Sequence, residues 1–261
     1  MSMDKVVASA AEAVADIKDG ATIAVGGFGL AGIPWFLIDA LLEQGASDLE
    51  IVSNNLGVDG QGLGKLLEAH RIRRAVSSYI GENKEFMRQY LAGELEVELT
   101  PQGALGERLR AGGAGIGAFF TPSGVGTVVA NGGMPWKYNA DGSVAISSPP
   151  KEVREFNGRR MVLETGIEAD VALVRAAVAD RHGNLRFHAA AQNFNPPAAM
   201  SGRLTIVEAE KVVEPGELDP ADVHVAGVFV DRVVALTPEQ AQFKMIEKRT
   251  TTPRPGTDEE A

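Results

Sequence analysis

Helical and strand periodicities alternate along the first 113 residues. Apolar residues recur every three to four positions over residues 4–18, the spacing of one helical face. A continuous β-branched run at residues 21–25 follows, as expected of a strand buried on both faces. The pattern then repeats. It predicts helices at 4–18, at 34–42, after Asn83 and at 100–113, and strands at 21–25, 49–53, 75–79 and 95–99.

Local signals place several helix ends. Pro34 suits a first helical turn, where its missing N–H costs nothing, and Gly45 ends the same helix. Asn83 is predicted to cap a helix whose buried face carries Phe86, Met87, Tyr90 and Leu91.

The second half of the chain is richer in strand patterns. Short apolar runs predict strands at 144–146, 161–163, 171–174, 204–207 and 228–234, and residues 237–240 form a capping box that starts a last helix. No linker-like stretch separates the halves. We therefore predict one domain over residues 1–249, an α/β fold with an open, mostly parallel sheet flanked by helices, and a disordered tail at 250–261.

Composition narrows the function classes. Of 261 residues, 44% are hydrophobic and 23% charged, which is a globular balance. Cysteine is absent, which excludes thiolate catalysis and Cys-ligated metals, and the formal charge of −10 disfavours nucleic-acid binding. No apolar run approaches the length of a membrane span. These features predict a cytoplasmic protein that binds neither membrane nor nucleic acid.

Glycine is the anomaly, with 30 residues clustered mainly in the first 133. The densest cluster runs from a predicted strand into a predicted helix and is called the glycine loop here: Gly26, Gly27, Phe28, Gly29, Leu30, Ala31 and Gly32. Backbone N–H groups in such a turn, together with a helix N-terminus, suit an anion or a polarised carbonyl.

Two other interpretations of the glycine loop stay open. Gly27, Gly29 and Gly32 match the spacing of the dinucleotide-binding fingerprint, but that fingerprint also needs an acid at the end of the second strand. Here Glu50 stands at the start of that strand, and Ser53-Asn54-Asn55 stand at its end. A purely structural glycine turn is the remaining alternative.

Polar residues at predicted strand ends supply the other candidates. Asn54 follows one strand and Gln102 another, and each has a structural alternative as part of a turn. Residues 81–85 form a further candidate, with a plain helix cap as the alternative. The four histidines are scattered, so we predict no metal site, and no nucleophile is evident. The pattern indicates half of an active site.

The sequence resembles the A (alpha) subunit of the family I CoA-transferases, most closely their succinyl-CoA:3-ketoacid group. The resemblance runs from about Val6 to Val234 and includes the signature Gly-Gly-Phe-x-x-x-Gly-x-Pro at residues 26–34. Further matching stretches are residues 52–55, 77–83, 93–103, 154–158, 180–184 and 193–195.

The resemblance implies an open α/β sheet and transfer of CoA from succinyl-CoA to a 3-oxo acid such as acetoacetate. In this family the group that attacks the acyl-CoA thioester is a glutamate of the B (beta) chain. The glycine loop would line the CoA side of the site, and Asn54 and Gln102 would stabilise the oxyanion. No tightly bound cofactor is implied, since CoA and acyl-CoA are substrates.

The implied partner is a CoA-transferase B subunit, in an A–B heterodimer or an A2B2 assembly. The corresponding chain of a 3-oxoadipate or acetate CoA-transferase is the nearest alternative, and a nucleotide-binding protein a more remote one. The chain departs from the family pattern at Ala31, where relatives often carry cysteine, and at Trp35, where they often carry an acid. Trp35 is expected to affect packing or the partner contact.

Overall fold

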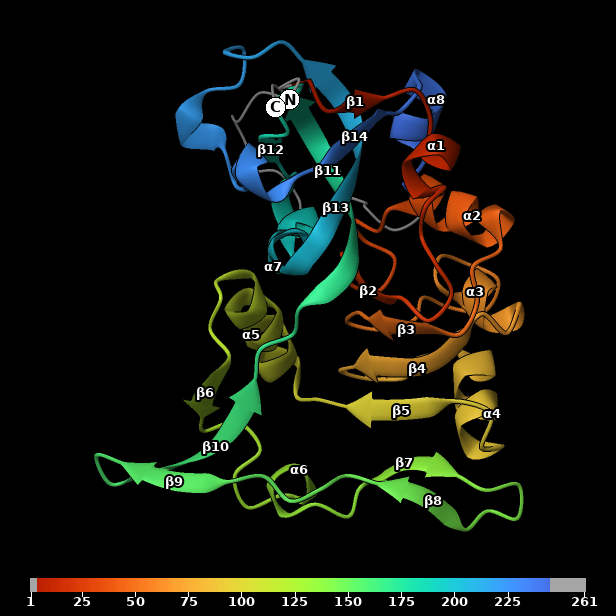
Figure 1. Ribbon diagram of the computed structural model, residues 1–261, viewed down its shortest axis with the longest axis vertical. Helices are drawn as coiled ribbons and strands as arrows, with labels where there is room; N and C mark the ends of the chain where they lie inside the picture. The colour runs from red at the N-terminus through yellow and green to blue at the C-terminus, as the bar shows by residue number, and fades with distance from the viewer. Residues whose placement is uncertain (1–3, 245–261) are drawn as a thin grey trace, which may run out of the picture.

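A twisted, mostly parallel β-sheet forms the centre of the molecule (Figure 1). The computed structural model describes residues 4–244. In the main path of this sheet the order is β1-β14-β13-β11-β2-β3-β4-β5, and every neighbouring pair on that path is parallel. The strands are β1 (Val6–Val7), β2 (Thr22–Val25), β3 (Leu49–Val52), β4 (Ile72–Ser77), β5 (Glu96–Leu99), β11 (Ala169–Asp180), β13 (Gly202–Val213), β14 (Arg232–Ala235) and β12 (Leu185–Arg186), which pairs antiparallel with β11. The predicted fold class is confirmed.

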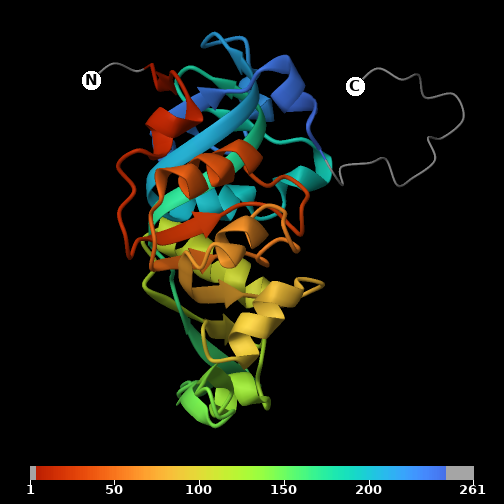
Figure 2. The same ribbon diagram turned by 90° about the vertical axis from the view of Figure 1, so that its right-hand side faces the viewer.

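Helices cover both faces of this sheet. The first layer contains α1 (Ala10–Val14), α2 (Trp35–Gln44), α3 (Gly64–Glu68) and α4 (Lys84–Leu91), which lie toward the viewer in Figure 2. The second contains α5 (Gln102–Gly113) and α7 (Asn195–Ser201). Along β2, Ile23 and Val25 join the core under the first layer, while Ala24 joins the core under the second. This burial on both sides explains why β2 reads as a continuous apolar run.

A distal extension, residues 118–165, lies beyond the β5 edge, at the bottom of Figure 1. It contains a three-stranded antiparallel sheet in the order β6-β10-β9, a two-stranded sheet β7-β8, and a short helix. Their bounds are β6 (Ala118–Thr121), α6 (Val128–Asn131), β7 (Pro135–Tyr138), β8 (Val144–Ser147), β9 (Val153–Phe156) and β10 (Arg159–Thr165). The Tyr90 hydroxyl of α4 donates to the Pro135 carbonyl at 2.7 Å and ties β7 to the body.

The predicted helix at 4–18 is wrong in its first half. Val6 and Val7 form β1, which pairs with Val233 and Val234 of β14. Helix α1 begins only after Ser9, whose hydroxyl accepts the Glu12 N–H. Two adjacent β-branched residues suit an edge strand with one side chain on each face, and this outweighs the helical spacing.

The predicted burial on α4 is only partly confirmed. Asn83 does cap the helix, with its Oδ1 accepting the Phe86 N–H at 2.8 Å, and Phe86 is buried. Met87 and Leu91 are instead exposed, and Gln89 is buried, donating to the Leu67 carbonyl at 2.7 Å.

In the second half, four predicted strands correspond to β8, β10, β11 and β13, with β11 and β13 much longer than expected. The strand predicted at 228–234 begins only at Arg232, because Val228 lies in a short 3-10 turn, η3 (Gly227–Phe229), and is 83% exposed. The capping box is confirmed at α8 (Pro238–Gln242). Two further 3-10 turns are η1 (Ala189–Gln192) and η2 (Pro220–Asp222). The predicted tail at 250–261 lies outside the described residues.

Candidate functional site

The carboxyl ends of β2, β3, β4 and β5 bring most of the predicted site segments to one edge of the sheet. Parallel pairing continues past the strand ends as a ladder of backbone hydrogen bonds. The Ser78 N–H donates to the Asn54 carbonyl at 3.0 Å, and the Thr100 N–H donates to the Ser77 carbonyl at 2.9 Å. The segments that hold Asn54 and Gln102 are therefore separated only by the segment after β4.

The glycine loop follows β2, which lies between β11 and β3. The chain runs outward from β2 to β5 on one side and from β11 to β14 on the other, so β2 and β11 flank the switch point of the sheet. The Gly26 N–H donates to the Leu173 carbonyl of β11 at 2.9 Å and anchors the start of the loop there. Open α/β sheets bind their ligands at such points.

Within the loop, Phe28 and Ala31 exchange two backbone hydrogen bonds of 3.0 Å and close a tight turn. Gly29 has φ 59° in this turn, a left-handed conformation that favours glycine. Gly26 is required for a different reason, because a Cβ there would lie 2.0 Å from Asn195 Oδ1. Within the described part of the chain, the N–H groups of Gly27 and Gly29 have no hydrogen-bond partner.

The N-terminus of α2 faces an anion, but this anion is a side chain of the protein itself. Glu208 Oε2 accepts the N–H groups of Phe36 and Leu37 at 2.9 and 3.0 Å. Its other oxygen, Oε1, lies 3.2 Å from Nη1 of the buried Arg175. Complete burial raises the pKa of Glu208 to about 7, against the lowering effect of Arg175 and the two N–H donors. The predicted use of this helix end for a ligand anion is therefore wrong.

Asn54 is completely buried at the edge of the sheet beside the start of the glycine loop. Its neighbour Ser53 donates a hydroxyl hydrogen bond of 3.0 Å to the carbonyl of Val25, the residue before Gly26. The Asn54 Nδ2 donates to Ser78 Oγ at 2.8 Å, and its Oδ1 has no hydrogen-bond partner among the described residues. A half-turn of the amide exchanges these atoms and presents the NH2 group, because the Ser78 hydroxyl both donates and accepts.

Gln102 is the first residue of α5 and its side chain is exposed. The turn before it is held by buried groups, since Arg108 Nη1 donates to Thr100 Oγ1 at 3.3 Å and to Glu98 Oε1 at 2.6 Å. Gln102 is therefore a free amide on a fixed turn.

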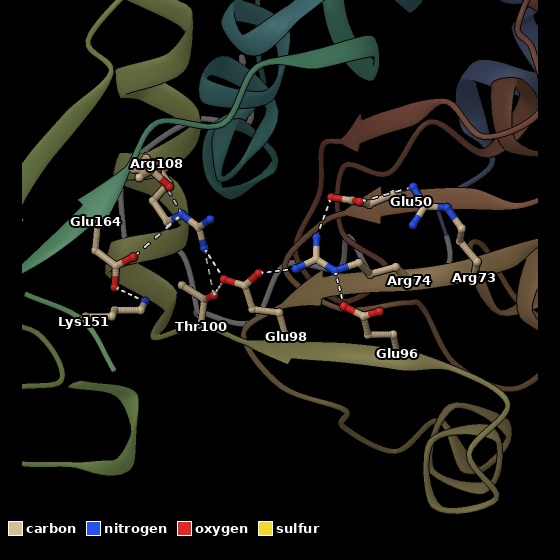
Figure 3. Close-up of polar contacts among 10 residues, drawn as sticks. Glu50, Arg73, Arg74, Glu96, Glu98, Thr100, Arg108, Lys151 and Glu164 are labelled. Carbon is tan, nitrogen blue, oxygen red and sulfur yellow. Dashed lines mark hydrogen bonds and ion pairs between the residues drawn. The ribbon is translucent and has the colours of Figure 1, made fainter. Parts of the chain in front are cut away.

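The ion pairs around Arg108 belong to a longer network (Figure 3). Arg74 joins three strands by contacting Glu50, Glu96 and Glu98 at 2.6 to 2.8 Å. Arg108 then links Glu98 to Glu164 of β10, which Lys151 contacts at 2.7 Å. Burial favours the neutral form of Glu98, but Arg108 and Arg74 outweigh it and hold its pKa below the ordinary value. The network fixes the distal extension to the edge of the sheet.

Residues 81–85 also reach this edge. Asp59, Glu82, Lys84 and Met87 are among the residues that line an open hollow of about 630 Å³. Asn83 is occupied as the cap of α4 and donates to the Leu56 carbonyl at 2.8 Å, which supports its structural interpretation.

The structure lacks the acid that a dinucleotide site needs at the end of β3. Glu50 is held instead by Arg74 and lies 3.6 Å from Arg73. Among residues 4–244, no group of three or more His, Asp or Glu side chains could hold a metal ion, and no helix is long and apolar enough to cross a membrane.

Sequence reasoning missed the buried polar residues behind the glycine loop. Arg175 and Glu208 each interrupt an apolar strand run, and Asn195 belongs to a stretch noted only for its resemblance. Trp35 proves to be a packing residue, 4% exposed, with its ring 5.2 Å from that of Phe243.

Comparisons with known proteins agree on one family. A family model described as "Coenzyme A transferase" matches residues 7–236. The chain is 66% identical over 248 residues to a Mycobacterium tuberculosis protein named as the probable A subunit of a succinyl-CoA:3-ketoacid coenzyme A transferase, covering 95% of this chain and 99% of that one. It is 53% identical over 246 residues to the human "Succinyl-CoA:3-ketoacid coenzyme A transferase 2, mitochondrial", covering 94% of this chain and 47% of that one.

Solved structures show the same architecture. An acyl-CoA transferase from Escherichia coli O157:H7 matches with a TM-score of 0.75 at 25% identity, over 92% of this chain and 48% of that one. Glutaconate coenzyme A-transferase from Acidaminococcus fermentans matches with a TM-score of 0.73 at 22% identity, over 91% of this chain and 77% of that one. The chain thus spans about half the length of the human and E. coli proteins.

Proposed function

The chain belongs to the coenzyme A transferase family, and we propose that it is the A subunit of an enzyme that moves CoA from succinyl-CoA to acetoacetate. The observation that carries this proposal is the buried Asn54 amide, with one polar atom unpaired among the described residues, next to the glycine loop at the switch point of the sheet. A buried polar group without a partner is costly unless a ligand completes it.

The proposed reaction uses a glutamate of a B subunit. Its carboxylate oxygen attacks the thioester carbonyl of succinyl-CoA, the C–S bond breaks, and CoA leaves as the thiolate. The thiolate then attacks the glutamyl carbonyl of the resulting anhydride, which releases succinate and leaves a glutamyl-CoA thioester. Acetoacetate repeats the two steps in reverse order, so acetoacetyl-CoA forms and the glutamate is regenerated.

Each addition step places negative charge on a carbonyl oxygen. Asn54 and Gln102 are the proposed side-chain donors to that charge, and the glycine loop lines the CoA side of the site. A positioned neutral donor in such a site contributes about 3 to 4 kcal/mol to transition-state stabilisation. The proposed reaction therefore needs neither a metal nor a bound organic cofactor.

The partner is proposed to be a B subunit, in an A–B heterodimer or A2B2. The mycobacterial and Xanthomonas relatives are each named as one of two kinds of chain, the A chain, and this supports a partner. The doubled length of the human relative supports it as well.

The test is co-expression of this chain with a candidate B chain, followed by an assay for acetoacetyl-CoA formed from succinyl-CoA and acetoacetate. We expect activity in the pair and in neither chain alone. Activity with 3-oxoadipate or acetate instead would keep the reaction and change the acceptor. A stable complex that transfers CoA to none of these acids would refute the proposal, and saturable binding of NAD would then favour a nucleotide site.

Two glycines that flank β2 provide a matched control. Gly27→Val places a Cβ 2.3 Å from Ile33 Cγ2 in the loop and should abolish transfer. Gly20→Val, at the other end of the strand, also strains a left-handed glycine (φ 77°), but nothing lies within 4 Å of its Cβ. It should leave transfer intact.

A further inference from the structure

Asn195 lies against the glycine loop although it is far away in the sequence. It is completely buried, and its amide makes three hydrogen bonds. Its Nδ2 donates to the Gly32 carbonyl at 2.9 Å and to the Ala191 carbonyl at 2.8 Å. Its Oδ1 accepts the Arg175 N–H of β11 at 3.1 Å. One side chain thus connects the end of the loop to the central strand.

Asn193 makes a second connection to the same loop. Its Nδ2 donates to the Ala31 carbonyl at 3.2 Å and to the Ala190 carbonyl at 2.9 Å. Its Oδ1 accepts the Phe194 N–H at 2.6 Å, which fixes the orientation of the amide. Two consecutive loop carbonyls, those of Ala31 and Gly32, are therefore held by side chains from one segment.

Holding these carbonyls fixes the direction of the N–H groups that share their peptide planes. A peptide unit is planar, so an anchored carbonyl leaves the N–H of the next residue no independent rotation. This matters most in a glycine-rich segment, because glycine has the largest backbone freedom to lose. Without the two asparagines, only the Phe28–Ala31 turn and the two ends would order the loop.

The fit between Asn195 and the loop is close. A Cβ on Gly32 would lie 3.0 Å from Asn195 Nδ2, and one on Gly26 would lie still nearer its Oδ1. The glycines at both ends of the loop therefore permit the contact with Asn195.

We propose that Asn193 and Asn195 are positioning residues for acyl transfer, which hold the glycine loop in its reactive shape without touching substrate. This inference rests on the proposed function. The loop orients the acyl-CoA carbonyl, and the two amides keep it rigid between turnovers. Their loss is expected to lower the rate of the chemical step and to leave acyl-CoA binding largely unchanged.

The test replaces one amide donor at a time by an acceptor of the same shape. Asn195→Asp and Asn193→Asp each remove the hydrogen bond to the loop. In the complex with the B chain we expect kcat to fall about 10²-fold, as for a small misplacement of reacting groups, with little change in the KM for succinyl-CoA. Asn193 is only partly buried, so its variant folds even if the buried Asn195→Asp does not.

Amide hydrogen exchange in the full chain gives an independent measurement. Loss of one hydrogen bond should speed exchange in a peptide covering residues 26–34 about tenfold, with peptides from β4 unchanged. Asn184→Ala is the matched control. Asn184 accepts the Gly227 N–H at 2.8 Å and donates to Asp180, so it anchors a different turn. Its loss should lower the melting temperature and leave kcat unchanged.

Wild-type exchange rates in the loop together with wild-type kcat in either Asp variant would overturn the inference. So would a fall in kcat of the same size in Asn184→Ala, because that would indicate a general loss of stability. If the wild-type pair transfers no CoA, the proposed function fails, and the exchange rates still decide whether the asparagines hold the loop.

Discussion

Glu208 gives the protein an unusual dependence of stability on pH. The carboxyl is completely buried and its pKa is raised to about 7 from an ordinary value of 4.5. Between these two pH values the folded protein holds a proton that the unfolded chain has released. The free energy of unfolding therefore falls as the pH rises through this window.

The size of the effect follows from the shift. At 1.36 kcal/mol per pKa unit, integration between pH 5 and pH 8 gives a loss of about 2 to 3 kcal/mol of stability from this one group. Other carboxyls with shifted pKa values act elsewhere. The pKa of Glu85, for example, is lowered to about 2 by its hydrogen bonds to Arg88 and Gln89, so it affects stability below about pH 4.5.

The assay is urea unfolding of the wild type and of Glu208→Gln at pH 5, 6, 7 and 8. The variant should lose the decline between pH 5 and 8, because glutamine does not titrate. Glu210→Gln is the control. It removes a second carboxylate from Arg175, lying 3.2 Å from Nε, but keeps Glu208 and should keep the decline. A decline of equal size in Glu208→Gln would refute the assignment to Glu208.

Three further predictions concern stability and catalysis. Arg108→Met should destabilise the fold by about 3 to 5 kcal/mol, because buried carboxylates lose their cation, whereas Arg110→Met on the exposed face of the same helix should leave the melting temperature nearly unchanged. Gly45→Ala should cost about 1 kcal/mol in urea unfolding, because φ there is 95°, while Gly103→Ala within α5 should stabilise by up to about 1 kcal/mol; the opposite order would contradict the role of φ. Asn54→Ala should lower kcat of the complex about 10²- to 10³-fold with little change in KM, and an unchanged kcat would remove Asn54 from the oxyanion site.

The sequence predicts the first half of the sheet better than the second. Strands β2 to β5 follow from short apolar runs between helical patterns, because each is buried on both faces by neighbouring segments. The predicted lengths of β11 and β13 are far too short because Arg175 and Glu208 interrupt their apolar runs. These two residues are direct partners across the strands, so each charge is buried only because the other is present. No local window contains both.

The candidate site shows the same division. The strand-end rule brings Asn54 and Gln102 to one edge, since it depends only on parallel pairing. The contact of Asn195 with the glycine loop depends on a segment more than 160 residues later, and nothing near the loop signals it. The carboxylate at α2 is likewise hidden from sequence reasoning, because a helix N-terminus indicates that an anion is favoured and does not indicate its source.

The place of β2 in the sheet also sets the order in which the protein is completed during synthesis. Strands β2 to β5 can pair as soon as residue 99 has left the ribosome, but the partner on the other side of β2 is β11, which begins at Ala169. Until then β2 is an open edge of a nascent half-sheet, with its backbone groups available to other chains. Asn195 emerges later still. The glycine loop is thus the last part of the site to be fixed, and a chain truncated before β11 would carry Asn54 and Gln102 yet expose an edge prone to aggregation.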